Sequence, residues 1–246
     1  MMKIVGLIPA RYSSTRFPGK PLADINGKPM IRWVYEQALR AETLSDVVVA
    51  TDDQRIADAV VGFGGKVSMT SDKHRSGTDR CCEVVEKMNG IDAVVNIQGD
   101  EPFINPEQIN QVARLISADG TDIASLCKVV RDEGELFSPN AVKVVFDKNG
   151  RALYFSRNTM PYMRGLEREK WLGNGTFYKH IGIYAYRTEV LKTIARLPQS
   201  GLELSESLEQ LRWLENGFCI KMGVTEFESY SIDTPQDLEN CLRFFR

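Results

Sequence analysis

Three cationic side chains occupy one short stretch near the start of the chain, PARYSSTRFPGK (9–20). They are Arg11, Arg16 and Lys20. Guanidinium and ammonium groups on one turn-rich loop can bind the phosphates of a nucleotide. Backbone N–H groups near Ser13, Ser14 and Gly19 would add further donors. The alternative is a solvated basic turn that binds no ligand.

This loop does not follow the patterns of other phosphate-binding loops. The Walker A pattern G-x-x-x-x-G-K-[ST] needs a glycine where Ser14 stands and a hydroxyl residue where Pro21 follows Lys20. The dinucleotide pattern G-x-G-x-x-G is missing as well. The sequence therefore excludes a P-loop NTPase and predicts a polyphosphate site of another kind.

Carboxylates that could hold a metal ion beside such phosphates follow a strongly apolar run. NIQGDEP (96–102) places Asp100 and Glu101 at the end of a predicted strand. Magnesium prefers carboxylate oxygens, so we expect Asp100 to be a metal ligand and Glu101 to support it. Asp100 could instead cap the next helix, although Asn105 is better placed for that role.

A second acidic candidate, Asp233, ends an extended run in SIDTPQDLE (231–239). Thr234 and Pro235 after it are typical of a helix N-terminus, so this motif alone indicates only a helix start. Asp233 would act as a metal ligand if the fold brings it beside Asp100.

The elements that must position these residues alternate between strand and helix patterns in the first half of the chain. Short β-branched runs predict strands at 3–10, 46–51, 66–70, 93–99 and 122–130. Amphipathic segments predict helices at 29–42, 53–64, 78–89 and 105–118. Such alternation indicates an α/β fold with a mostly parallel sheet, where ligands bind beyond the carboxyl ends of the strands.

The second half of the chain has a different pattern. Two strands, 141–147 and 151–157, flank an Asn-Gly turn, which is typical of an antiparallel hairpin. A strand is also expected at 178–187, with its isoleucines on one face and His180 and Tyr184 on the other. We expect the remaining elements to be a mobile loop at 163–176, helices at 188–196 and 205–215, a strand at 219–226 and a last helix after Pro235.

Composition excludes several classes of protein. The 246 residues carry a net charge of −2, which argues against a broad nucleic-acid-binding face. The five cysteines are odd in number and lack C-x-x-C spacing, which indicates neither a zinc site nor a disulfide framework. No apolar run has the length of a membrane span, and no signal-peptide pattern precedes the first strand. We therefore expect a cytoplasmic protein.

Several motifs occur in an order that resembles one known family. They are I-P-A-R-Y-x-S-T-R-x-P-G-K-P-L, H-x-S-G-T-x-R (74–80), N-I-Q-G-D-E-P, Y-F-S-R (154–157), H-I-G-I-Y (180–184), L-E-Q-L-R (208–212) and D-T-P-x-D-L-E (233–239). Together they span nearly the whole chain. The sequence resembles the 3-deoxy-D-manno-octulosonate (Kdo) cytidylyltransferases, also called CMP-Kdo synthetases.

The resemblance implies a nucleotidyltransferase of the EC 2.7.7 class, with a Rossmann-like fold of the nucleotide-diphospho-sugar transferase type. Such an enzyme joins CTP and Kdo to give CMP-Kdo and pyrophosphate for lipopolysaccharide biosynthesis. We expect a single domain over 1–246, in which an antiparallel excursion at 135–190 supplies hairpin, dimer and sugar contacts. Magnesium as the cofactor and a homodimer as the assembly are also implied.

The resemblance further implies roles for individual residues. The catalytic residues would be Arg11, Lys20, Asp100 and Asp233, the last two as magnesium ligands. The nucleotide would contact Ala10, Arg11, Arg16, Lys20, Ser76, Gly77, Thr78, Arg80 and Asp100. The sugar would contact Gln98, Arg157, His180, Tyr184, Glu209 and Gln210. From the residue types alone, His180 could equally be a surface-strand histidine, Arg157 an ion-pair partner and Tyr184 a packing residue.

The predicted reaction is an in-line attack of the Kdo C2 hydroxyl on the α-phosphorus of CTP, with magnesium lowering the pKa of that hydroxyl. Three alternatives remain open. The first is a cytidylyltransferase for another keto-acid sugar, such as a sialic acid or an amino-Kdo. The others are a uridylyl- or guanylyltransferase and a non-catalytic nucleotide sensor of the same fold.

Overall fold

The computed structural model describes residues 2–13 and 16–243. Its strands are β1 Ile4–Ala10, β2 Asp24–Ile25, β3 Lys28–Pro29, β4 Asp46–Thr51, β5 Val67–Met69, β6 Ala93–Asn96, β7 Ile123–Val129, β8 Lys143–Phe146, β9 Ala152–Ser156, β10 Tyr178–Arg187 and β11 Ile220–Val224. Its α-helices are α1 Met30–Leu39, α2 Gln54–Gly62, α3 Gly77–Glu86, α4 Pro106–Ser117, α5 Glu133–Phe137, α6 Trp171–Asn174, α7 Thr188–Ile194, α8 Gly201–Glu206, α9 Glu209–Glu215 and α10 Pro235–Arg243. Turns of 3-10 helix are η1 Lys20–Leu22 and η2 Arg168–Lys170.

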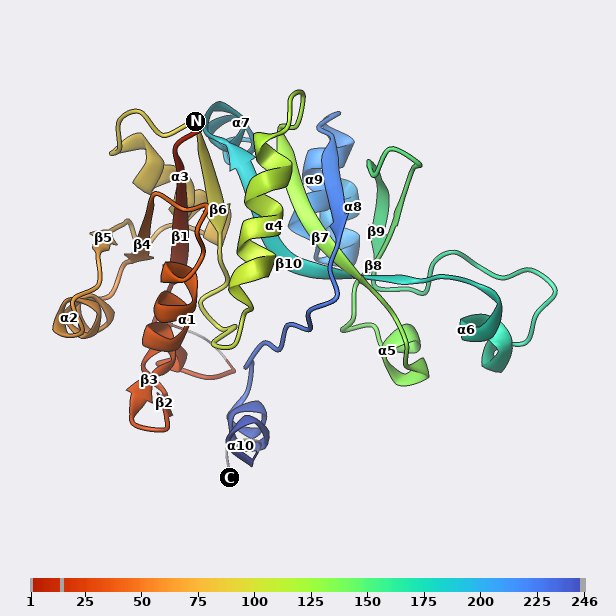
Figure 1. Ribbon diagram of the computed structural model, residues 1–246, viewed down its shortest axis with the longest axis horizontal. Coiled ribbons are helices and arrows are strands. Elements are labelled where there is room, and N and C mark those ends of the chain that lie inside the picture. Colours follow the sequence, from red (N-terminus) through yellow and green to blue (C-terminus); the bar gives the residue numbers. More distant parts are fainter. Residues whose placement is uncertain (1, 14–15, 244–246) are drawn as a thin grey trace.

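One large sheet organises the described residues (Figure 1). Its central strands follow the order β11-β7-β10-β6-β1-β4-β5, and the β8–β9 hairpin pairs with β10. β10 is antiparallel to both β6 and β7, while the other strands of the central row run in one direction. The predicted fold class is therefore confirmed, including its antiparallel excursion.

Helices cover both faces of this sheet. One core cluster packs α1, α2 and α4 against the sheet, with Val34 among its buried residues. A second cluster packs α3, α7 and α9 against the opposite face, with Trp213 among its residues. The strand β10 contributes to both clusters by simple alternation, as predicted, since Ile183 belongs to the first and Tyr184 to the second.

The strand order reverses beside β1. From β1 the chain moves to β4 and β5 on one side, and it then returns to β6 on the other side. The carboxyl ends of β1 and β6, at Ala10 and Asn96, therefore lie at the same edge of the sheet. Open α/β sheets bind ligands at such a reversal.

An excursion leaves this edge between β7 and β10, and it contains α5, the β8–β9 hairpin and α6 (Figure 1). The predicted Asn-Gly turn is present, because Gly150 N–H donates to the Asp147 carbonyl at 2.9 Å. The strand β10 falls within the range predicted for the excursion, 135–190, but lies inside the central sheet. The single-domain organisation stays a prediction.

Two predicted elements differ from the structure. The stretch 163–176, predicted to be a loop, contains η2 and α6 because Trp171 is buried in a small aromatic cluster. The indole N–H of Trp171 donates to the Leu166 carbonyl at 3.0 Å, which fixes the turn. The single helix predicted over 205–215 is divided into α8 and α9, because Ser207 takes a left-handed conformation that ends α8.

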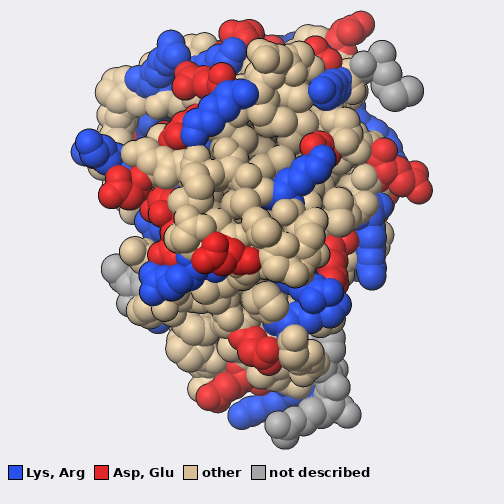
Figure 2. Space-filling view, turned by 90° about the vertical axis from the view of Figure 1, so that its left-hand side faces the viewer, with Lys and Arg blue, Asp and Glu red and all other residues tan. Residues whose placement is uncertain are grey.

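Lysine and arginine side chains alternate with acidic ones on the side of the molecule where α2 and β5 lie (Figure 2). This mixture of signs agrees with the small net charge of the chain. Of the helices that the structure describes, none has the length and apolar character needed to cross a bilayer.

Candidate active site

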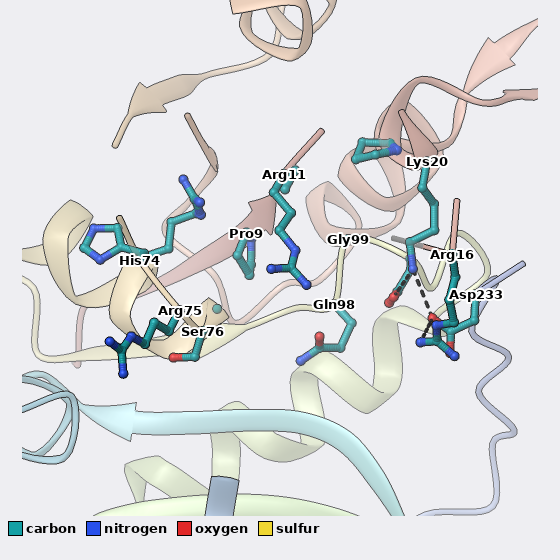
Figure 3. A pocket seen from close by; sticks show the side chains of 15 residues that line it. Pro9, Arg11, Arg16, Lys20, His74, Arg75, Ser76, Gln98, Gly99 and Asp233 are labelled. Carbon is teal, nitrogen blue, oxygen red and sulfur yellow. Dashed lines mark hydrogen bonds and ion pairs between the residues drawn. The ribbon is translucent and has the colours of Figure 1, made fainter. Parts of the chain in front are cut away.

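A pocket of about 320 Å³ opens at the carboxyl ends of β1 and β6 (Figure 3). It is lined by Pro9, Ala10, Arg11, Arg16, Lys20, Pro21, His74, Arg75, Ser76, Gly77, Arg80, Gln98, Gly99, Asp100 and Asp233. All four predicted catalytic residues are in this lining. So are the predicted nucleotide contacts, with the exception of Thr78.

The cationic loop is closed at its base, where Gly19 N–H donates to the Tyr12 carbonyl at 2.9 Å. Gly19 has a φ of +72°, and a Cβ there would come within 3.1 Å of the Tyr12 ring, so the turn requires glycine. The 3-10 turn η1 then begins at Lys20 and directs its side chain into the pocket. Ser14, a predicted source of a backbone donor, lies outside the described residues.

The centre of the pocket is an ion-pair cluster. Lys20 Nζ lies 2.6 Å from a carboxylate oxygen of Asp100 and 3.2 Å from one of Asp233. Arg16 Nη2 lies 3.0 Å from the same Asp233 oxygen (Figure 3). The fold thus brings Asp233 beside Asp100, a proximity that the sequence alone could not establish.

The donor set of this cluster fits magnesium bound together with phosphate groups. Both carboxylates converge on one cationic atom, Lys20 Nζ, which stands where a metal cation would be held between them. Magnesium is usually bound by one or two protein carboxylates, and phosphates and waters complete its octahedron. Across residues 2–13 and 16–243, no group of three or more His, Cys, Asp or Glu side chains could hold a metal without such help.

The wall opposite Lys20 is the N-terminus of α3. Ser76 caps this helix by accepting from Asp79 N–H at 3.1 Å, within a reciprocal capping box. Arg80 reaches the pocket from the next turn but is 4% exposed, and its guanidinium lies 3.2 Å from Asp52 and contacts the Thr70 hydroxyl. Arg80 is therefore a fixed part of the wall.

Two further cationic residues line the pocket, Arg11 and Arg75. Neither has an ion pair within the part of the chain that the structure describes, so both are available to an anionic ligand. The sequence places His74 and Arg75 beside the predicted nucleotide turn and leaves open whether they contact a phosphate. Arg75 occupies the variable position of the H-x-S-G-T-x-R motif, so the motif itself assigns it no role.

Three of the predicted sugar contacts, Gln98, His180 and Tyr184, form a second wall on and beside β10, and of these three only Gln98 lines the pocket. Gln98 lines the pocket, and its side-chain amide donates to the Gly182 carbonyl of β10 at 2.9 Å. The rings of His180 and Tyr184 lie 5.2 Å apart, centroid to centroid, on the predicted common face of β10. The buried Tyr184 hydroxyl has no hydrogen-bond partner among the described residues, and Tyr184 lines neither this pocket nor the one beside Glu101.

Glu209, another predicted sugar contact, is bonded to a residue on the nucleotide side of the site. Its carboxylate accepts from the Thr78 hydroxyl at 2.9 Å, so the predicted contact Thr78 lies behind the pocket lining. Burial raises the pKa of Glu209 above its ordinary value. Gln210, the next residue of α9, is buried and does not line the pocket.

Arg157 is separated from the pocket. Its guanidinium donates to three backbone carbonyls, those of Glu206 at 2.7 Å, Pro139 at 3.1 Å and Ser207 at 3.3 Å. These bonds hold the end of β9 against the break between α8 and α9. The structure therefore gives Arg157 a supporting position, which neither the sequence motif nor an acidic neighbour indicated.

His180 should make the stability of the fold depend on pH. Its ring packs edge-on against Phe155 and shares a 3.0 Å hydrogen bond with Ser125, and burial lowers its pKa to about 3. Between pH 6.5 and 3 the unfolded chain therefore binds a proton that the folded chain does not, so stability falls as the pH falls. We expect about 1–2 kcal/mol of this loss between pH 7 and 5. Urea unfolding at both pH values should show it in the wild type and a smaller loss in His180→Gln, whereas equal losses would contradict it.

Glu101, predicted to support Asp100, is buried behind it. Its carboxyl group contacts the Ser229 hydroxyl, and burial raises its pKa to about 7. Glu101 also borders a second pocket of about 540 Å³ between β10, the residues around α5 and the chain before α10. It therefore contacts the segment that carries Asp233 and does not line the first pocket.

Comparison with known proteins places these features in a family. The family described as Cytidylyltransferase matches residues 5–240. Curated relatives named 3-deoxy-manno-octulosonate cytidylyltransferase include one from Parabacteroides distasonis, 60% identical over 99% of this chain and 98% of its own. Another, from Bacteroides thetaiotaomicron, is 57% identical over 100% of this chain and 99% of its own.

A solved structure agrees with the sequence relatives. It is described as CMP:2-keto-3-deoxy-manno-octonic acid synthetase complexed with CTP. It is 43% identical, covers 99% of this chain and 98% of its own, and superimposes with a TM-score of 0.92. The chain is therefore a nucleotidyltransferase that belongs to the cytidylyltransferase family, among the 3-deoxy-manno-octulosonate cytidylyltransferases.

Proposed function

We propose that this chain transfers CMP from CTP to the C2 hydroxyl of 3-deoxy-D-manno-octulosonate, with release of pyrophosphate. The observation that carries the proposal is the convergence of Asp100 and Asp233 on Lys20, in a pocket that Arg11 and Arg16 also line. Nucleotidyl transfer needs cations for the triphosphate and carboxylates for a metal, and catalysis then follows from positioning and electrostatics. The names of the similar curated proteins support this choice of substrates.

In this proposal the residues of the opening loop bind the triphosphate. Arg11, Arg16 and Lys20 neutralise its charge, and Lys20 exchanges its carboxylate partners for phosphate oxygens when the nucleotide enters. Asp100 and Asp233 would hold magnesium, which when bound supplies Lewis-acid activation of the acceptor hydroxyl. Ser76, Gly77 and Arg80, with Ala10, would shape the wall against the nucleoside, with Thr78 behind them.

The acceptor would lie between the end of β6 and the face of β10. Gln98, His180 and Tyr184 would contact the sugar, and Glu209 would accept from its hydroxyl groups. Arg157 and Gln210 remain predicted sugar-site residues whose contribution is support of the wall. We further propose that the enzyme is magnesium-dependent, homodimeric and cytoplasmic, and serves lipopolysaccharide biosynthesis.

The test is pyrophosphate release with CTP and magnesium, comparing Kdo with a sialic acid and with no sugar. We expect release with Kdo only, and UTP in place of CTP should fail. Release with sialic acid only would keep the reaction class but overturn the proposed acceptor. CTP binding without release for any acceptor would favour a nucleotide sensor.

Gly99 should be required for the position of Asp100. A Cβ at Gly99 would lie 2.8 Å from the Pro9 carbonyl oxygen, so Gly99→Ala must move the loop that carries Asp100. Small displacements of reacting groups cost up to about 100-fold, and we expect a loss of at least about 10-fold in kcat. The matched control is Gly62→Ala in α2, where an added Cβ meets nothing within 4 Å and activity should be unchanged. Wild-type rates in Gly99→Ala would show that the loop tolerates the shift.

A further inference from the structure

Asp233 reaches the pocket on a segment without regular secondary structure. Residues 225–234, named here the strap, connect β11 to α10 and cross the α4 side of the sheet (Figure 1). Gln108 of α4 donates to the Phe227 carbonyl of the strap at 3.4 Å. Since no helix or strand fixes the strap, the position of Asp233 depends on side-chain and backbone anchors.

Asp237 of α10 accepts from the Asp233 N–H at 3.1 Å, and two further anchors join the strap to the loop after β6. Ile232 N–H donates to the Asp100 carbonyl at 2.9 Å, and the Ile232 side chain is 2% exposed. Ser229 donates its hydroxyl to Glu101, the neighbour of Asp100. These contacts join the strap to the loop after β6. They can form only if residues 228 and 229 are correctly placed above the sheet.

The position of residues 228 and 229 is fixed by an ion-pair network around Glu228. Its carboxylate accepts from Lys128 of β7 and, at 2.8 Å, from Lys179 of β10. Lys179 also donates to Glu135 of α5 at 2.6 Å. The two lysines are direct cross-strand partners, so Glu228 neutralises two like charges that face each other on the sheet.

The network is partly withdrawn from solvent, with side-chain exposures between 20% and 24% for all four groups. Burial alone would raise the pKa of Glu228, but the hydrogen bonds from Lys128 and Lys179 outweigh it, and the pKa lies below its ordinary value. Glu228 is therefore a charged anchor held from two strands. An exposed pair on the same strap, Glu226 with Arg131 at 3.9 Å, has no such enclosure.

We propose that Glu228 is a positioning residue, which fixes the strap so that Asp233 stands opposite Asp100. The inference rests on the metal site of the proposed function. Without the charge of Glu228, Lys128 and Lys179 repel each other beneath the strap, and the contacts of Ser229 and Ile232 lose their alignment. Asp233 then samples positions away from Asp100, while the cationic loop is unchanged.

The test compares Glu228→Gln, which keeps the shape and removes the charge, with the matched control Glu226→Gln. Each change is made in the wild type and in an Asp233→Asn background. Manganese binding in the presence of CTP is measured by electron paramagnetic resonance, without sugar and without turnover. Hydrogen exchange of the Ile232 amide and of the β7 amides is measured on the same samples.

We expect Glu228→Gln to weaken manganese binding about 10-fold, the scale found for residues that orient metal ligands. Glu226→Gln should stay within about twofold, as is usual for exposed substitutions. In the Asp233→Asn background, Glu228→Gln should have no further effect, because it acts through Asp233. The Ile232 amide should exchange faster in Glu228→Gln, with the β7 amides unchanged.

Any of the following results would overturn the inference. The first is unchanged manganese binding in Glu228→Gln. The second is an equal loss with and without Asp233, or faster exchange in β7 as well, since either would indicate a general loss of stability. A wild-type protein that binds no manganese with CTP would remove the metal site itself, and with it this inference. Failure of the acceptor assignment alone would leave manganese binding intact, so the two proposals fail separately.

Discussion

The Asp100→Asn variant should lose about 100- to 1000-fold in kcat, the scale for removing one electrostatic group aimed at the transition state. Asparagine has nearly the size of aspartate, and the Asp100 carbonyl that accepts from Ile232 is retained. The fold and the strap anchor should therefore persist. What disappears is one of two charges that would hold a metal, together with the 2.6 Å partner of Lys20.

Pyrophosphate release measures this effect, and CTP binding by calorimetry should remain within about 10-fold of the wild type, because the cations of the loop are intact. Asp58→Asn is a suitable control, because Asp58 is an exposed carboxylate in α2 that accepts from Gln54. A near-normal rate in Asp100→Asn would contradict the assignment of Asp100 as a metal ligand.

A comparable loss is expected at Lys20, for which Lys20→Met removes the charge and keeps most of the length of an unbranched side chain. Loss of a positioned cation should lower kcat/KM for CTP about 100- to 1000-fold. The same change leaves Asp100 and Asp233 close together without the cation between them. Added magnesium should therefore raise the melting temperature of Lys20→Met more than that of the wild type in the absence of nucleotide.

Thermal unfolding with and without magnesium tests the second part, and pyrophosphate release tests the first. Lys28→Met is the matched control, because Lys28 forms a 2.8 Å pair with Glu36 outside the pocket lining. If magnesium stabilises Lys20→Met and the wild type equally, Lys20 does not compete with the metal for these carboxylates.

The first half of the fold could be predicted because each element has its own periodicity and its own boundary residues. The predicted strand 46–51 coincides with β4, and Asn105 caps α4 through a capping box as its type suggested. The direction of β10 could not be predicted, since alternation along a strand is the same for parallel and antiparallel neighbours. The break at Ser207 was missed because only its backbone conformation marks it.

The residues of the candidate site also differ in whether a local sequence pattern could predict their position. Arg11, Lys20 and Asp100 stand beside strand ends, where the general geometry of α/β sheets predicts a ligand. Asp233 depends on the strap, and its anchors are a backbone carbonyl and charged groups on two distant strands, which no local pattern reveals. The surroundings of Arg157 could not be predicted for a similar reason, since its partners are main-chain carbonyls that any residue type could supply.

The first and last residues of the segment between β7 and β10 are neighbours in the sheet. Val129 is the cross-strand partner of Tyr178, and Val130 N–H donates to the Phe177 carbonyl at 2.9 Å. The central row of strands from β11 to β5 is thus continuous without this segment, and the β8–β9 hairpin adds to the sheet beside β10. Changes in the length of the loops around that hairpin cost only the slowly growing entropy of loop closure. Insertions and deletions can accumulate there during evolution while the triphosphate pocket keeps its geometry. Relatives of this chain can therefore differ in length within this stretch and still share the residues that line the pocket, all of which lie outside it.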